Sequence, residues 1–111
     1  MTNTSTDAGD WCSDRQAIAA DHPSLPGHFP GRPVVPGVVI LDCVREALQS
    51  RYPQHRLAGL PAVKFLAPLL PEQGFIIQLS GEAPRLRFVV QRDSGETLAQ
   101  GQLAIEAQAQ A

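Results

Sequence analysis

The sequence of 111 residues lacks an excess of positive charge, because nine lysine and arginine residues stand against eleven aspartate and glutamate residues. Nucleic acids and anionic membranes bind clustered positive surfaces, so we expect neither as a partner. No run of 18 apolar residues is present, which excludes a membrane-spanning helix on length grounds. The first ten residues are polar and lack the basic and apolar regions of a secretory signal, so we expect a cytoplasmic protein.

Cysteine is also scarce. Cys12 and Cys43 belong to no C-x-x-C pair and to no pattern of cysteine and histidine that binds a metal. In an intracellular chain both thiols would stay reduced. We interpret Cys12 as a strand or tail residue and Cys43 as a packing residue of a helix.

The organisation along the chain indicates one domain. Residues 1–10 are rich in Thr, Ser, Asp, Asn and Gly and predict a disordered tail, and residues 11–111 predict a single domain. Because a domain this short buries a modest share of its surface, a second copy of the chain is expected to cover part of it. Apolar and polar residues alternate in five segments, which predict strands over 11–20, 60–66, 75–80, 85–92 and 97–107. A tight turn is expected at 93–95, and Gly101 suggests a bulge or a close backbone approach.

Residues 23–37 contain five prolines and three glycines, which predict an extended, ordered loop. Residues 38–50 then predict a helix, with Pro36 in the region favoured at a helix start. One apolar stripe has helical spacing and consists of Ile40, Leu41, Val44, Ala47 and Leu48. Val38 and Val39 add apolar groups on the other side, so we expect the first half of the helix to be buried almost all round.

Two residues of this region have side chains suited to acid–base chemistry. His28 lies in the rigid loop, and Asp42 lies 14 positions later in the apolar part of the helix. An imidazole that titrates near neutrality can accept a proton, and a carboxyl group in apolar surroundings keeps its proton more readily. The pair therefore predicts general acid–base catalysis. The alternative is that the loop is only a stiff connector and Asp42 a solvated helix residue.

Residues 27–38 read Gly-His-Phe-Pro-Gly-Arg-Pro-Val-Val-Pro-Gly-Val. This segment resembles the signature G-H-F-P-G-x-P-x-x-P-G-V of the 3-hydroxyacyl-[acyl-carrier-protein] dehydratases of FabZ and FabA type. Their acidic residue stands where Asp42 stands, and weaker similarity extends over roughly residues 15–107. Aspartate at this position is similar to the FabA branch, since the FabZ branch has glutamate. The shorter N-terminal part makes the chain similar to compact dehydratases of aryl-polyene biosynthesis clusters.

The resemblance implies an α+β hot-dog fold, in which a curved antiparallel sheet wraps around one long central helix. It implies a homodimer with shared active sites, where His28 of one chain faces Asp42 of the other. The substrate would be a 3-hydroxyacyl thioester on the phosphopantetheine arm of an acyl carrier protein, in fatty-acid-like or polyene biosynthesis. His28 and Asp42 would be catalytic, the Gly37 N–H would bind the thioester oxygen, and Val38, Phe29 and Val35 would contact substrate. For Phe29 and Val35, plain packing beside the helix is the alternative. No metal or bound cofactor is implied.

Two other functions remain open at this point. A thioesterase of the same fold would hydrolyse the acyl thioester, although the intact Gly-His-Phe-Pro segment argues against it. A non-catalytic subunit that binds a carrier protein or stabilises a heterodimer is less compatible with the presence of both His28 and Asp42. Scattered cations could form a basic rim for an acidic carrier protein, namely Arg32, Arg45, Arg51, Arg56 and Lys64.

Overall fold

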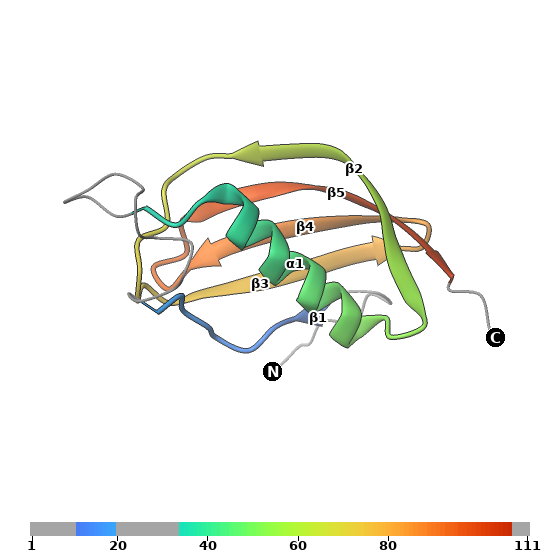
Figure 1. Cartoon of the computed structure of the whole chain (residues 1–111), viewed down its shortest axis with the longest axis horizontal. Helices are drawn as coiled ribbons and strands as arrows, with labels where there is room; N and C mark the ends of the chain where they lie inside the picture. The colour runs from blue at the N-terminus through green and yellow to red at the C-terminus, as the bar shows by residue number, and fades with distance from the viewer. Residues whose placement is uncertain (1–10, 20–33, 108–111) are drawn as a thin grey trace.

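A computed structural model describes residues 11–19 and 34–107 of the chain. Its elements, in chain order, are β1 (Trp11–Cys12), α1 (Gly37–Arg51), β2 (His55–Phe65), β3 (Phe75–Glu82), β4 (Arg85–Arg92) and β5 (Thr97–Ala107). The strands form one sheet in the order β1-β3-β4-β5-β2, and every neighbouring pair is antiparallel. Helix α1 crosses one face of this sheet (Figure 1). This α+β architecture agrees with the arrangement expected from the sequence.

Helix α1 begins at Gly37 and ends at Arg51, one residue beyond each predicted end. Its buried side chains follow helical spacing and include all of the predicted stripe except Leu41, which is half-buried. Val38 is 64% exposed, so the expected burial of the first half on all sides is not met in the single chain. The sheet covers one side of the helix, and Val38 lies on the other side.

The inner face of the sheet supplies most of the core. Along β3 and β4 every second side chain is almost fully buried, namely Phe75, Ile77, Leu79, Leu86, Phe88 and Val90. Strand β5 adds Leu98, Ala99, Leu103 and Ile105. The alternation in the sequence is therefore confirmed, because these residues line the face that packs on α1. The predicted turn at 93–95 is also present, and Gly95 has a φ of 96°, a conformation that glycine adopts readily.

Strand β2 forms one edge of the sheet and starts at His55, five residues earlier than predicted. Its register against β5 shifts twice, between Leu57 and Gly59 and again before Ala62, and each shift places one extra residue on β2. Pro61 lies within the second irregularity, a position that an edge strand tolerates. The prediction for Gly101 is confirmed as a close approach, because a Cβ atom there would come within 2.1 Å of the Ala62 carbonyl oxygen.

The opposite edge is formed by β1, which is much shorter than the predicted strand over 11–20. Ser13 is the local cause, since its hydroxyl accepts the N–H of Ile77 at 2.9 Å in addition to the main-chain bond between the same residues. Pairing resumes only as an isolated bridge between Gln16 and Phe75. Within the described residues, no helix is long and apolar enough to cross a membrane. Residues 1–10 lie outside the described residues, so the disordered tail and the single domain remain predictions.

Candidate active site at the amino end of the helix

An apolar cavity of about 460 Å³ lies beside the amino end of α1. The walls come from the segment before the helix, from the helix itself and from the segment that leaves β2. They consist of Val34, Val35, Gly37, Ile40, Phe65, Leu66, Ala67, Pro68 and Leu69. None of these residues has a polar or charged side chain, so the polar groups of the wall belong to the main chain. A cavity of this kind suits an acyl group better than a charged ligand.

Main-chain hydrogen bonds hold the cavity walls in place. The N–H groups of Leu66 and Ala67 both donate to the Leu98 carbonyl, at 2.7 and 3.2 Å. On the opposite wall, the Val35 N–H donates to the Leu69 carbonyl at 2.8 Å. The guanidinium of Arg92 donates to the Pro68 carbonyl at 2.7 Å. The segment over 66–69 is therefore tied both to the sheet and to the residues that precede the helix.

The first turn of α1, which is the positive end of the helix dipole, lies at this cavity. Pro36 precedes the helix in an extended conformation, no side chain of the residues that the structure describes caps the amino end, and the first turn carries no acidic residue. The first main-chain bonds run from Val39 and Ile40 to the Pro36 carbonyl, so the N–H groups of Gly37 and Val38 precede them. An uncapped helix terminus of this kind can donate hydrogen bonds to a developing negative charge on oxygen.

Phe65 covers the start of the helix. A Cβ atom built on Gly37 would lie 2.8 Å from the Phe65 ring, so glycine at this position lets the ring approach the backbone closely. The ring is nevertheless 49% exposed. Reasoning from the sequence did not identify Phe65 as a site residue, although it ends the apolar alternation of β2 next to a proline-containing segment. The position of Phe65 at the end of a predicted strand is the sequence feature that could have identified it.

Asp42 lies away from the cavity of its own chain. It is about 160° around the helix from Ile40, which lines the cavity, because successive residues are separated by about 100°. Its side chain is 59% exposed and forms an ion pair with Arg45 at 3.7 Å. The apolar surroundings expected for this carboxylate are therefore not found among residues 11–19 and 34–107 of a single chain. Val38 and Arg45 lie on the same exposed side of the helix.

The structure brings together only some of the residues proposed from the sequence. Val35 and Gly37 both line the cavity, whereas Val38 is not among the lining residues and points to solvent. His28 and Phe29 lie outside the described residues, so their placement is untested. The cavity and Asp42 are therefore the parts of the site whose relative positions the structure defines.

Cys43 follows Asp42 in the sequence and is buried in the core, as predicted. Burial, together with the smaller effect of the negative charges of Glu46 and Asp42, raises the pKa of its thiol to about 11. A nucleophilic thiolate is therefore scarce at this position near neutral pH. Among the described residues, no group of three or more histidine, cysteine, aspartate or glutamate side chains could hold a metal ion.

Comparison with known proteins shows the family to which the chain belongs. The family model described as "ApeI-like: ApeI dehydratase" matches residues 5–102. The chain belongs to the ApeI-like dehydratase family. The 3-hydroxyacyl-[acyl-carrier-protein] dehydratase FabZ of Haemophilus influenzae is 30% identical over 108 residues, which cover 89% of this chain and 72% of the relative. The corresponding protein of Thermomicrobium roseum is 32% identical over 98 residues, covering 80% and 64%.

Two solved structures have a similar fold. The dehydratase heterocomplex ApeI:P from Xenorhabdus doucetiae has a TM-score of 0.77 at 23% identity, and the match covers 92% of this chain and 91% of that chain. An uncharacterised protein from Erwinia carotovora subsp. atroseptica has a TM-score of 0.80 at 23% identity, covering 94% and 89%. The family model thus confirms the predicted dehydratase family, and the solved structures confirm the predicted hot-dog fold.

Proposed function

We propose that this ApeI-like dehydratase removes water from 3-hydroxyacyl thioesters carried by an acyl carrier protein and yields trans-2-enoyl thioesters in fatty-acid-like or polyene biosynthesis. The observation that carries the proposal is the apolar cavity at the uncapped amino end of α1. It can hold the acyl chain beside main-chain donors for the thioester oxygen. The Haemophilus influenzae relative, named as a dehydratase of acyl-carrier-protein substrates, supports the same substrate class.

In the proposed reaction, His28 takes the proton from C2 while the Gly37 N–H stabilises the negative charge that develops on the thioester oxygen. The electron pair released at C2 forms the C2–C3 double bond. The bond between C3 and the hydroxyl oxygen breaks, and Asp42 donates a proton so that the hydroxyl leaves as water. Phe29, Val35 and Val38 are proposed to contact the substrate, and Phe65 joins them because it lines the cavity.

The active site is proposed to require two chains. Within one chain, Asp42 and the cavity lie on different sides of α1, so the carboxylate cannot reach an acyl group in its own cavity. Three large apolar residues remain exposed, namely Val38 (64%), Phe65 (49%) and Leu66 (49%). Nearby, β2 has an edge that no other described strand pairs with. Such an edge and such apolar groups are usually covered by another chain.

The second chain is proposed to be another copy of this protein. A related but different hot-dog chain is the alternative, because the Xenorhabdus doucetiae structure is titled a heterocomplex. The two arrangements differ in a simple observation. The purified chain alone is active if it forms a homodimer, whereas a heterodimer needs the added partner chain before enoyl product appears.

The proposal is tested with two inactive variants, His28→Ala and Asp42→Asn. Each should lower turnover of a 3-hydroxyacyl thioester by about 10²- to 10⁴-fold, since each removes one acid–base group from every site. When the two variants are mixed and subunits exchange, about half of the dimers combine both chains, and one of their two sites is complete. Activity should then recover to roughly one quarter of the wild-type value.

Glu46→Gln is the matched control, because Glu46 is a second exposed carboxylate one turn further along the same helix. Its turnover should stay within about twofold of wild type, since Glu46 lies outside the proposed pair. Absence of recovery after mass spectrometry has confirmed subunit exchange would show that both groups act from one chain. Release of free thiol without enoyl product would identify the chain as a thioesterase instead.

A further inference from the structure

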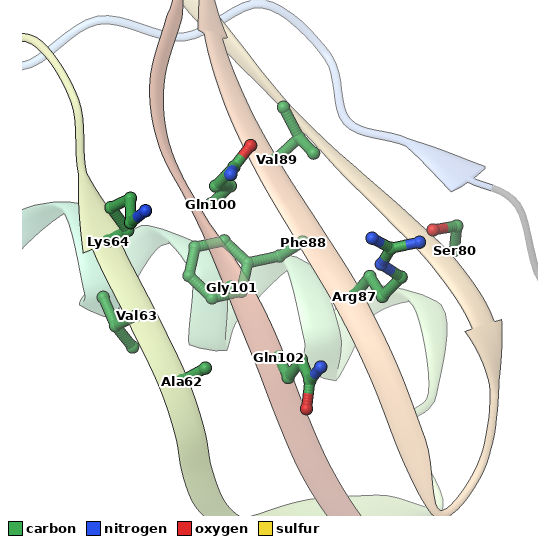
Figure 2. A pocket seen from close by; sticks show the side chains of 10 residues that line it. All are labelled: Ala62, Val63, Lys64, Ser80, Arg87, Phe88, Val89, Gln100, Gly101 and Gln102. Atoms are coloured by element: carbon green, nitrogen blue, oxygen red, sulfur yellow. The ribbon is translucent and has the colours of Figure 1, made fainter.

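Strand β4 carries three arginines, and one of them differs from the others in the face of the sheet it occupies. Arg87 lies on the face that points away from α1, beside a hollow of about 520 Å³ (Figure 2). Arg85 alternates to the same face, and both side chains are exposed. Arg92 instead continues the series of buried residues on the inner face. Its partner across β3 is Phe75, which is fully buried, so Arg92 is a cation at the edge of the core.

This inward position of Arg92 is costly for a charged side chain unless partners compensate. The side chain is 21% exposed, and its Nε atom lies 3.2 Å from the Glu96 carboxylate. Nε nevertheless has no hydrogen-bond partner among the described residues. The Nη2 atom donates to the Pro68 carbonyl at 2.7 Å. An apolar side chain would extend the core without the desolvated charge, so stability alone does not account for arginine at this position.

The Pro68 carbonyl is the point of the cavity wall that main-chain bonds leave to a side chain. Ala67, immediately before it, donates its N–H to the main chain of β5, and the carbonyl of Leu69, immediately after it, accepts the Val35 N–H. Proline has no N–H group, so its carbonyl is the one main-chain group of Pro68 that can form a hydrogen bond. Arg92 supplies the donor for that carbonyl.

The main chain of Arg92 is itself held by the turn that follows β4. Its N–H donates to the Glu96 carbonyl at 2.9 Å, and its carbonyl accepts the Gly95 N–H at 2.7 Å. A hydrogen bond with a charged donor is stronger than one between neutral groups. The guanidinium therefore fixes the cavity wall at Pro68 relative to a turn that is already held in place.

We propose that Arg92 is a positioning residue of the acyl cavity, an inference that rests on the function proposed above. By holding the Pro68 carbonyl, Arg92 fixes the wall over 66–69 and thereby sets the length of the acyl chain that the cavity accepts. Arg92 does not line the cavity, so it acts through Pro68 and not by touching the substrate. A long acyl chain contacts more of the wall than a short one and therefore depends more on the position of the wall.

The test compares two acyl lengths on one carrier. Wild type, Arg92→Met and Arg92→Lys are assayed with the 3-hydroxybutyryl and 3-hydroxyoctanoyl thioesters of pantetheine. Methionine keeps an unbranched side chain but cannot donate to Pro68, so kcat/KM should fall about tenfold for the octanoyl substrate, mainly through KM, and stay within about threefold for the butyryl substrate. Lysine supplies one donor for the single carbonyl, so it should restore the octanoyl value to within about threefold of wild type.

Glu96→Gln is the matched control, because it removes the ion pair of Arg92 and leaves the hydrogen bond to Pro68 intact. Both kcat/KM values should stay within about twofold of wild type. Arg92→Met should change the unfolding temperature by about 5 °C or less, since an apolar side chain replaces a partly buried charge. An Arg92→Met protein that no longer unfolds cooperatively would show that Arg92 holds the fold as a whole and would overturn the proposal.

Amide hydrogen exchange measures the wall independently of turnover. The N–H groups of Ala67 and Val35 should exchange about tenfold faster in Arg92→Met than in wild type, whereas the amides of β3 should keep their rates. Equal losses of kcat/KM for the two acyl lengths, or unchanged exchange at Ala67 and Val35, would overturn the proposal. Faster exchange in the variant of a protein whose wild type yields no enoyl product would overturn the proposed function and leave the role of Arg92 in the wall standing.

Discussion

Strands β2 and β5 are neighbours of equal length, with 11 residues each, yet they are buried very differently. Strand β5 lies between β4 and β2 and buries Leu98, Ala99, Leu103 and Ile105. Among the described strands, β2 has a neighbour on one side only, and none of its residues is fully buried. The comparison shows that β5 builds the core, whereas β2 leaves apolar side chains available for a ligand or another chain.

The largest expected difference between these regions involves two phenylalanines. Phe88 is 1% exposed beneath the sheet, whereas Phe65 is 49% exposed at the end of β2. Phe88→Ala should lower the free energy of unfolding by about 3–5 kcal/mol, because it leaves a cavity in the core. Phe65→Ala should cost about 1 kcal/mol or less in dilute protein. Urea unfolding measures both, and similar losses would remove the distinction between the two regions.

A smaller effect on stability is expected where β2 and β5 meet. A Cβ atom at Gly101 would clash with the Ala62 carbonyl and with the Phe88 ring, whereas one at Gly59 would meet nothing within 4 Å. Gly101→Ala should therefore destabilise the protein by about 2–3 kcal/mol through forced backbone movement. Gly59→Ala is the control and should change stability by about 0.5 kcal/mol or less. Thermal unfolding of the two variants side by side distinguishes these outcomes, and a stable Gly101→Ala protein would contradict the close approach.

The smallest expected effect concerns the exposed thiol of Cys12 and the buried thiol of Cys43. The pKa of Cys43 is raised to about 11, mainly by burial, so the folded state keeps this proton longer than the unfolded chain, whose thiol titrates near 9.0. Stability linked to Cys43 is therefore complete below pH 9.0 and declines as the pH rises towards about 11. Cys43→Ala should remove this decline, measured by urea unfolding at pH 8 and pH 10.5.

Alkylation provides a second measurement of the same contrast. Iodoacetamide at pH 8 should label the exposed Cys12 before the buried Cys43 in folded protein, as peptide mass spectrometry would show. Equal labelling rates would mean that Cys43 is accessible and that the burial on this side of α1 is incomplete.

The sequence predicted the elements whose pattern is set by one buried face. The bounds of β4 and β5 agree with the alternation along the chain, and α1 differs by one residue at each end. The same reasoning missed the start of β2, because apolar and polar residue types do not alternate regularly from His55 to Gly59, although the exposure of their side chains does. It also extended β1 too far, since the hydrogen bond from Ile77 to the Ser13 hydroxyl depends on a strand 64 residues away.

The candidate site was predictable only in part. Gly37 and Val35 could be identified in the sequence, and both line the cavity. The orientation of Asp42 could not, because the sheet decides which side of the helix is covered and a single sequence does not specify the partner chain.

The Leu98 carbonyl, which accepts both the Leu66 and the Ala67 N–H groups, has a consequence for how this protein can diversify. The wall of the cavity is held by main-chain atoms, and every residue other than proline supplies the same N–H group. A residue such as Leu66 can therefore be replaced by a larger or smaller one while the main chain of the cavity wall stays in place. A lineage could alter the acyl groups it accepts by single substitutions along 66–69, while the fold and the helix terminus that faces the substrate stay as they are.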